Sequence, residues 1–139
     1  MKSKYKIISV ILLISLTTAV ITTACKKYPE GPAISLRTKS ERLANTWKIE
    51  NYKINGNDYT SLLSDYKETF IKEGSYYYDW GILDGNGTWA FQNSNKEIQL
   101  TGNDHQSNRT LFILQLREET LWYYYIHNDE KHELHLVPN

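Results

Sequence analysis

The four histidines are the residues best suited to binding a metal ion, but their spacing argues against a metal site. His132 and His135 would share one face of a helix, whereas in a strand they point to opposite faces and cannot share an ion. His127 and His132 flank a four-residue turn and could meet across a hairpin. A third ligand, Asp129 or Glu130, has no support from a motif, and zinc sites use at least three protein ligands. We therefore predict no metal site and no cofactor.

Acidic residues offer little support for catalysis. Glu118 and Glu119 are adjacent, so in a strand their side chains diverge and cannot act as a paired acid and base. The segment 84–87, Asp-Gly-Asn-Gly, resembles the start of a calcium loop, but Trp89 and Asn95 stand where that loop needs glycine and an acid. We interpret this segment as a tight turn between two strands. No nucleophile motif is present in the sequence, so we predict that the protein is not an enzyme.

Cys25 is the only cysteine in the chain, and it follows an uncharged, mostly apolar run. Lys2, Lys4 and Lys6 precede that run, which extends over the 18 residues from Ile7 to Ala24. A basic start, a short apolar segment and a small-residue end are typical of a secretory signal peptide. A retained transmembrane helix is the alternative, although 18 residues are at the short limit for a span. An ordinary cleaved signal is a third interpretation.

The segment Thr22-Thr23-Ala24-Cys25 resembles the lipobox of bacterial lipoproteins, with Thr22 where that family prefers leucine. The resemblance implies cleavage after a signal peptide of residues 1–24 and attachment of a diacylglyceryl group to Cys25. Two or more acyl chains anchor a protein stably. We therefore expect the protein to be held at the cell envelope, at the outer membrane in a Gram-negative cell. Which face of the membrane it occupies stays open.

The rest of the chain divides into a tether and one domain. Residues 25–40 form the predicted lipidated tether, because Pro29, Gly31 and Pro32 favour extended, unpacked chain. Residues 41–139 are enough for one domain. Removing residues 1–24 takes three of the 16 basic residues and none of the 16 acidic ones, so the mature chain has a net charge of −3. That charge argues against a nucleic-acid partner, since phosphate binding needs a basic surface.

Short alternating apolar runs separated by turn residues predict an all-β domain. About eight such runs recur at spacings of roughly ten residues, which favours an antiparallel up-and-down barrel or a sandwich. Trp47 and Ile49 share one face of the first run, while Tyr52 follows in the opposite phase. The change of phase predicts a β-bulge near residues 50–51. Residues 59–66 are predicted to form a short helix.

The aromatic residues of the predicted strands are the remaining functional signal. Tyr76 and Tyr78 lie at period two on one face, as do Trp89 and Phe91. Such side chains can simply fill a small core. Alternatively, these four line a pocket for a small apolar or aromatic ligand.

Two segments, Leu43–Ile49 and Gly87–Phe91, resemble the lipocalin-like domain of small lipoproteins of Gram-negative bacteria. Lipocalins open with Gly-x-Trp, and here Asn45 takes the place of the glycine. The resemblance implies an eight-stranded barrel whose closed end is plugged by Trp47, and a binding role without catalytic residues. Two hypotheses follow. The barrel binds a small apolar or aromatic molecule, or it is solid and its surface binds an envelope protein or a glycan.

Overall fold

The computed structural model describes residues 35–103 and 107–139. The predicted signal peptide, Cys25 and most of the predicted tether lie outside these residues. The described elements are almost all strands, as the alternation predicts. In chain order they are α2 (Lys39–Leu43), β1 (Asn45–Ile54), β2 (Asn57–Asp58), the 3-10 helix η2 (Thr60–Leu63), β3 (Tyr66–Phe70), β4 (Ser75–Trp80), β5 (Leu83–Gln92), β6 (Glu97–Asn103), β7 (Arg109–Leu116), β8 (Leu121–His127) and β9 (Glu130–Pro138).

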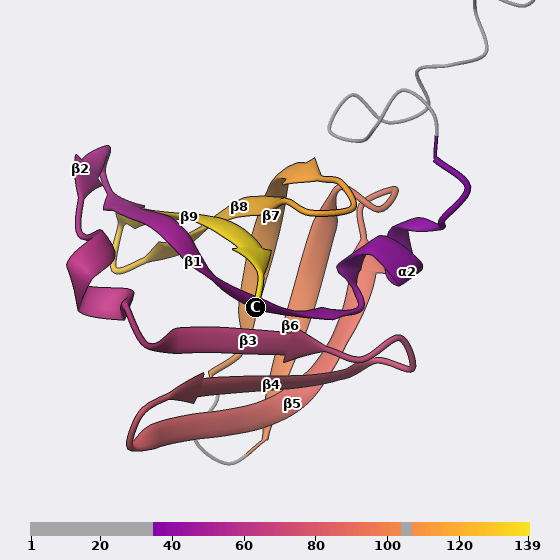
Figure 1. The fold of residues 1–139 in the computed structure, drawn as a ribbon, viewed down its shortest axis with the longest axis horizontal. Helices are drawn as coiled ribbons and strands as arrows, with labels where there is room; N and C mark the ends of the chain where they lie inside the picture. The colour runs from indigo at the N-terminus through magenta and orange to yellow at the C-terminus, as the bar shows by residue number, and fades with distance from the viewer. Residues whose placement is uncertain (1–34, 104–106) are drawn as a thin grey trace, which may run out of the picture.

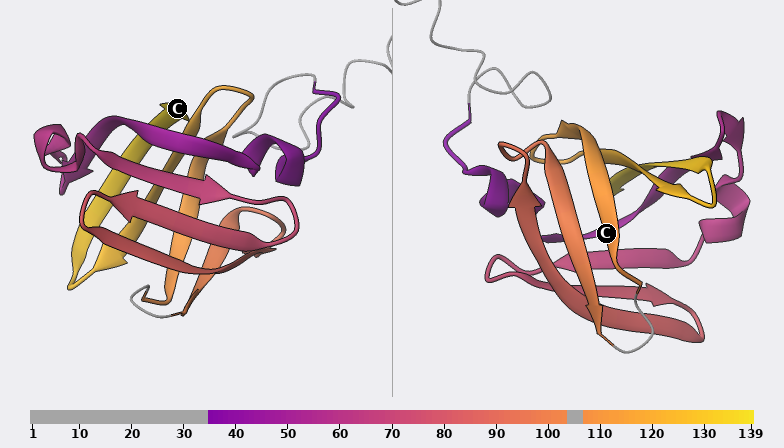
Figure 2. Two further views of the ribbon diagram at one scale, coloured as in Figure 1. Left: turned by 60° about the horizontal axis from the view of Figure 1, so that its bottom comes forward. Right: turned by 180° about the vertical axis from the view of Figure 1, so that it is seen from behind.

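The strands form one antiparallel sheet that closes into a barrel (Figures 1 and 2). Consecutive strands are neighbours from β3 to β9, and β1 closes the barrel by pairing with both β3 and β9. Eight strands make up the barrel, and the two-residue β2 extends β1 as a small hairpin. The predicted up-and-down barrel is therefore confirmed, and closure removes exposed sheet edges that would invite aggregation.

The predicted bulge in the first strand is also confirmed. The register of β1 against β9 shifts between Ile49 and Asn51. Before the bulge, Trp47 points into the barrel and is completely buried, and after it Tyr52 takes over the inward position. The extra residue therefore explains the change of phase in the sequence.

Helix α2 lies at one end of the barrel, where a capping box begins it (Figure 1). The Thr38 hydroxyl accepts a hydrogen bond from the Glu41 amide, and the Glu41 carboxylate accepts one from the Thr38 amide. Glu41 also pairs with Lys72 of the β3–β4 turn at 2.9 Å, and the Lys39 ammonium donates to the Asn95 carbonyl of the β5–β6 turn. We call this end of the barrel the closed end.

The hydrophobic core fills the closed end. Its completely buried members include Leu43 of α2 and residues that flank the turns there, such as Phe70, Leu116 and Leu121. The Trp47 indole N–H donates to the Leu43 carbonyl at 2.9 Å, which joins α2 to the first strand. Neither α2 nor η2 is long and apolar enough to cross a membrane, in the part of the chain that the structure describes.

The predicted turn over residues 84–87 is wrong, because these residues lie inside β5 and the turn falls at Gly81 and Ile82. Gly85 and Gly87 are needed for close packing instead. A Cβ atom on Gly85 would lie 2.2 Å from the Tyr78 ring, and one on Gly87 would lie 2.3 Å from the Thr101 carbonyl oxygen. Glycine in a strand often marks such a close approach. The predicted helix over residues 59–66 is a single 3-10 turn, η2.

Candidate functional site

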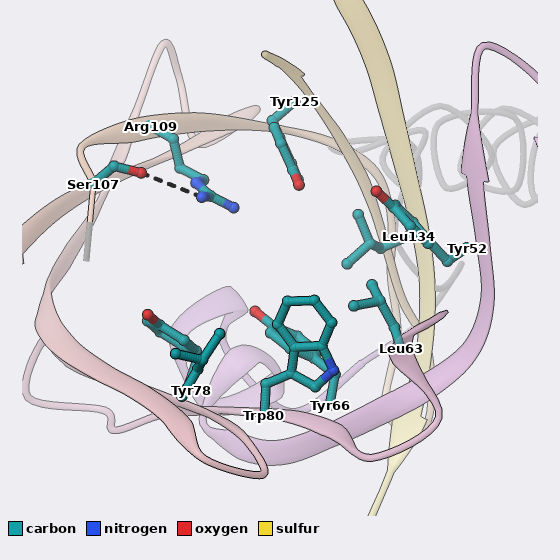
Figure 3. Close-up of a pocket in the computed structure, with 10 residues that line it drawn as sticks. Tyr52, Leu63, Tyr66, Tyr78, Trp80, Ser107, Arg109, Tyr125 and Leu134 are labelled. Atoms are coloured by element: carbon teal, nitrogen blue, oxygen red, sulfur yellow. Dashed lines mark hydrogen bonds between the residues drawn. The ribbon is translucent and has the colours of Figure 1, made fainter. Parts of the chain in front are cut away.

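A cavity of about 270 Å³ is lined by residues toward the end of the barrel opposite α2 (Figure 1), and Figure 3 shows it in close-up. Trp80 and Leu83 flank the β4–β5 turn on its rim, and Arg109 enters from the start of β7. Residues from almost every strand meet here because closure of the barrel brings their inward faces together. The lining residues are Tyr52, Leu63, Tyr66, Tyr78, Trp80, Leu83, Ser107, Arg109, Tyr125 and Leu134.

The cavity wall consists mainly of aromatic side chains, several of which end in a hydroxyl group. The rings of Tyr66 and Tyr78 stack at 6.2 Å between centroids. The hydroxyls of Tyr66, Tyr78 and Tyr125 point into the space between the strands, while Leu63 and Leu134 give one side an apolar surface (Figure 3). Large apolar surfaces with a few convergent polar groups are typical of small-molecule sites.

Arg109 carries the one permanent charge among the described residues that line the cavity. Its guanidinium carbon lies 4.4 Å from the centroid of the Tyr125 ring, within the range of a cation–π interaction. One of its nitrogens donates to the Ser107 hydroxyl at 3.3 Å. No carboxylate of the described residues forms a salt bridge with it. The guanidinium is thus a cation held against the cavity by aromatic and hydroxyl groups.

A buried carboxyl group, Glu68, lies behind the cavity wall. It is 1% exposed, and one of its oxygens accepts hydrogen bonds from the hydroxyls of Tyr66, Tyr76 and Tyr123 at 3.2, 3.0 and 3.1 Å. Its other oxygen has no hydrogen-bond partner among the described residues. Burial raises the pKa of Glu68 to about 7, although the three hydroxyls act in the opposite direction. Glu68 therefore exchanges its proton near neutral pH, in contact with the cavity residue Tyr66.

His132 supports the opposite side of the wall. Its Nδ1 atom lies 2.7 Å from the Tyr52 hydroxyl, and its ring stacks on that of Tyr125 at 4.9 Å. Burial lowers the pKa of His132, which favours the neutral imidazole. The residue thus orients Tyr52 and Tyr125 without adding a charge to the cavity at neutral pH. No group of three histidine, cysteine or acidic side chains among residues 35–103 and 107–139 is arranged to hold a metal ion.

The predicted ligand-binding residues divide between the cavity and the core. Tyr78 lines the cavity, and Tyr76 lies behind the wall with its hydroxyl on Glu68. Trp89 and Phe91 pack edge to face at 5.3 Å, and the Trp89 indole donates to the Ile71 carbonyl in the β3–β4 turn. These two belong to the closed end and do not line this cavity.

The predicted ligand-binding residues did not include Arg109 or the three cavity tyrosines Tyr52, Tyr66 and Tyr125. One signal could have found Arg109. Arg109 lies two residues before the buried Leu111, so both side chains are on the inward face of β7. A positive charge on the inward face of a barrel strand is unusual enough to indicate a site.

Comparison with known proteins adds no relative. No model of a protein family matches the chain, and a search of curated proteins finds no significant match.

Proposed function

We propose that this protein is a binding module that takes a small apolar or aromatic molecule into the cavity of its barrel. The cavity itself is the observation that carries the proposal, because a barrel packed solidly with side chains would leave no such space. Its volume of about 270 Å³ is just below the range of ~300–1,000 Å³ of typical ligand pockets. The ligand is therefore small, with up to three rings or a short chain.

In this proposal the barrel is a lipocalin-like lipoprotein anchored by a lipid on Cys25 at the cell envelope, at the outer membrane of a Gram-negative cell. The cavity and the predicted anchor then face opposite ways. Arg37, just before α2, pairs with Glu118 of the β7–β8 turn at 3.0 Å, so the tether would leave from the closed end. The cavity would open away from the membrane, where a soluble ligand reaches it. The proposal includes no catalysis and no nucleic-acid partner.

The cavity predicts binding of an uncharged aromatic probe, N-phenyl-1-naphthylamine. Fluorescence of the probe should rise on titration with the protein, and the melting temperature should rise with probe concentration, because a ligand bound to the native state stabilises it. Tyr78→Ala should weaken binding roughly tenfold by removing part of the aromatic wall. Tyr77→Ala is the matched control, since Tyr77 is 50% exposed on the other face of β4. Absence of any binding by the unsubstituted protein would contradict the proposal.

The anchor predicts a change of location in Cys25→Ser. Without the thiol no thioether to diacylglycerol forms, so the variant should lack acyl chains and leave the membrane fraction as a soluble or unprocessed form. Metabolic labelling with a fatty acid and cell fractionation measure the two effects. Cys25→Ser that is still acylated and membrane-bound would refute the lipoprotein assignment.

A second candidate function is supported by the rim of the cavity. Trp80, Ile82 and Leu83 at the tip of the β4–β5 hairpin are 40%, 98% and 53% exposed. Neighbouring exposed apolar side chains often mark an interaction site. In this alternative, the protein is an interaction lipoprotein that binds an envelope protein or a glycan through the hairpin tip. Failure of apolar probes to enter the barrel would favour it.

A further inference from the structure

Arg109 gives the cavity a chemical preference beyond size. Its guanidinium points into the space between the lining residues, stacked beside Tyr125 (Figure 3). A guanidinium has five N–H donors. Among the described residues, the guanidinium donates to the Ser107 hydroxyl and also interacts with Tyr125. These contacts use only part of its donors, so others are available to a molecule in the cavity.

No carboxylate among the described residues forms a salt bridge with Arg109, although its charge acts on the buried Glu68. None of the described residues lining the cavity is acidic. Glu68 lies behind Tyr66, and its carboxyl group is engaged by the hydroxyls of Tyr66, Tyr76 and Tyr123. A partly buried cation without a counterion is costly, and an anion bound beside it removes that cost.

The two sides of the cavity differ in polarity. Arg109 lies on one side, whereas Leu63 and Leu134 lie on the other (Figure 3). A molecule that spans the cavity would thus meet a guanidinium at one end and apolar side chains at the other. This arrangement suits an amphiphile with its charge at one end.

We infer that the cavity selects small aromatic or short-chain acids, whose carboxylate or sulfonate group binds Arg109 while the apolar body packs against Leu63 and Leu134. Guanidinium groups bind such anions through two parallel hydrogen bonds, which adds geometric selectivity to the charge. Nearby hydroxyls, such as that of Tyr125, can donate to the same anion. This inference rests on the proposed binding function and names the class of ligand.

Two probes with the same aromatic body separate charge from shape. The anionic probe is 8-anilinonaphthalene-1-sulfonate, and the uncharged one is N-phenyl-1-naphthylamine. Arg109→Gln should weaken binding of the sulfonate at least tenfold and change affinity for the uncharged probe by less than twofold. Arg117→Gln removes the same charge from an exposed position in the β7–β8 turn, at the closed end, and should affect neither probe. Equal loss of sulfonate binding in the two variants would overturn the inference.

A second measurement needs no substitution, so it stands even if Arg109→Gln fails to fold. 1-Naphthoate and its neutral amide, 1-naphthamide, have nearly the same shape. Naphthoate should displace the bound sulfonate probe from the unsubstituted protein at a concentration at least tenfold lower than naphthamide. Equal displacement by the two would refute selection for acids while leaving the binding function intact. Failure of both fluorescent probes to bind would refute the proposed function itself.

Discussion

Replacement of Trp47 by alanine is expected to lower the free energy of unfolding by ~3–5 kcal/mol, the range for removing a large buried aromatic side chain. Trp47 is 0% exposed, and its indole N–H satisfies the Leu43 carbonyl at the closed end. The substitution therefore creates a cavity and leaves a buried carbonyl without its partner. Urea denaturation of residues 26–139, followed by tryptophan emission and circular dichroism, measures the change.

Trp80→Ala is the matched control for Trp47→Ala. The Trp80 side chain is 40% exposed on the rim of the cavity, so its removal should cost less than about 1 kcal/mol. The two variants lose the same atoms but differ in burial and in the hydrogen bond that Trp47 donates to Leu43. Similar losses of stability for the two would show that Trp47 does not anchor the closed end as described.

Stability is expected to fall as pH rises from about 4.5 to above 7, because of Glu68. Its pKa is about 7 in the folded protein, against an ordinary value of 4.5. Between these values the folded state binds more protons than the unfolded state, so each rise in pH favours unfolding. The stabilisation is fully present below pH 4.5 and lost as pH passes through 7. A pKa difference of this size corresponds to a change in the free energy of unfolding on the order of 3 kcal/mol.

Glu68→Gln tests this assignment because it keeps the shape of the side chain and removes the ionisation. The variant should lose the decline in stability between pH 5 and 8, and it should be more stable than the unsubstituted protein at pH 8. Glu50→Gln, at an exposed position of β1, should keep the original profile. An unchanged profile in Glu68→Gln would contradict the assignment.

Two other titrating groups change the stability in the opposite direction to Glu68 or in a different pH range. The pKa of Glu41 is lowered to about 2, chiefly by the Thr38 backbone amide and Lys72, so its contribution is present above pH 4.5 and declines as pH falls toward 2. His132 has a pKa lowered by burial, so its titration removes stability as pH falls, opposite to Glu68. Comparison of Glu68→Gln with the unsubstituted protein at each pH cancels these contributions.

The sequence alone was sufficient to predict the all-β architecture, because alternation of apolar residues is a local property of each strand. The bulge near residues 50–51 was also visible in the sequence, since it depends on neighbours a few positions away. The N-terminal residues that predict a lipid anchor lie outside the described structure, and that prediction stays to be tested with Cys25→Ser.

The tertiary structure decided where along the barrel each inward residue lies. Tyr78 and Trp89 both fit the inward alternation, yet Tyr78 lines the cavity and Trp89 packs at the closed end. Alternation with period two determines on which face of a strand a residue lies. It does not determine how deep in the barrel the residue lies, because that depends on the register between strands. For the same reason, no local pattern could place Arg109 beside Tyr125, because the two meet only through strand pairing across the sheet.

Glycine shows the same division between local and tertiary causes. Residues 84–87 have the composition of a turn, and turn chemistry is what a local analysis recognises. In the barrel, Gly85 instead lies under the Tyr78 ring and Gly87 against the Thr101 carbonyl, so the residue type was selected by contacts with other strands. Glu68 is similar, because its raised pKa arises from burial in the closed barrel, where Tyr76 and Tyr123 reach it from other strands. The sequence determined which residues face inward, whereas closure of the barrel determined which of them meet.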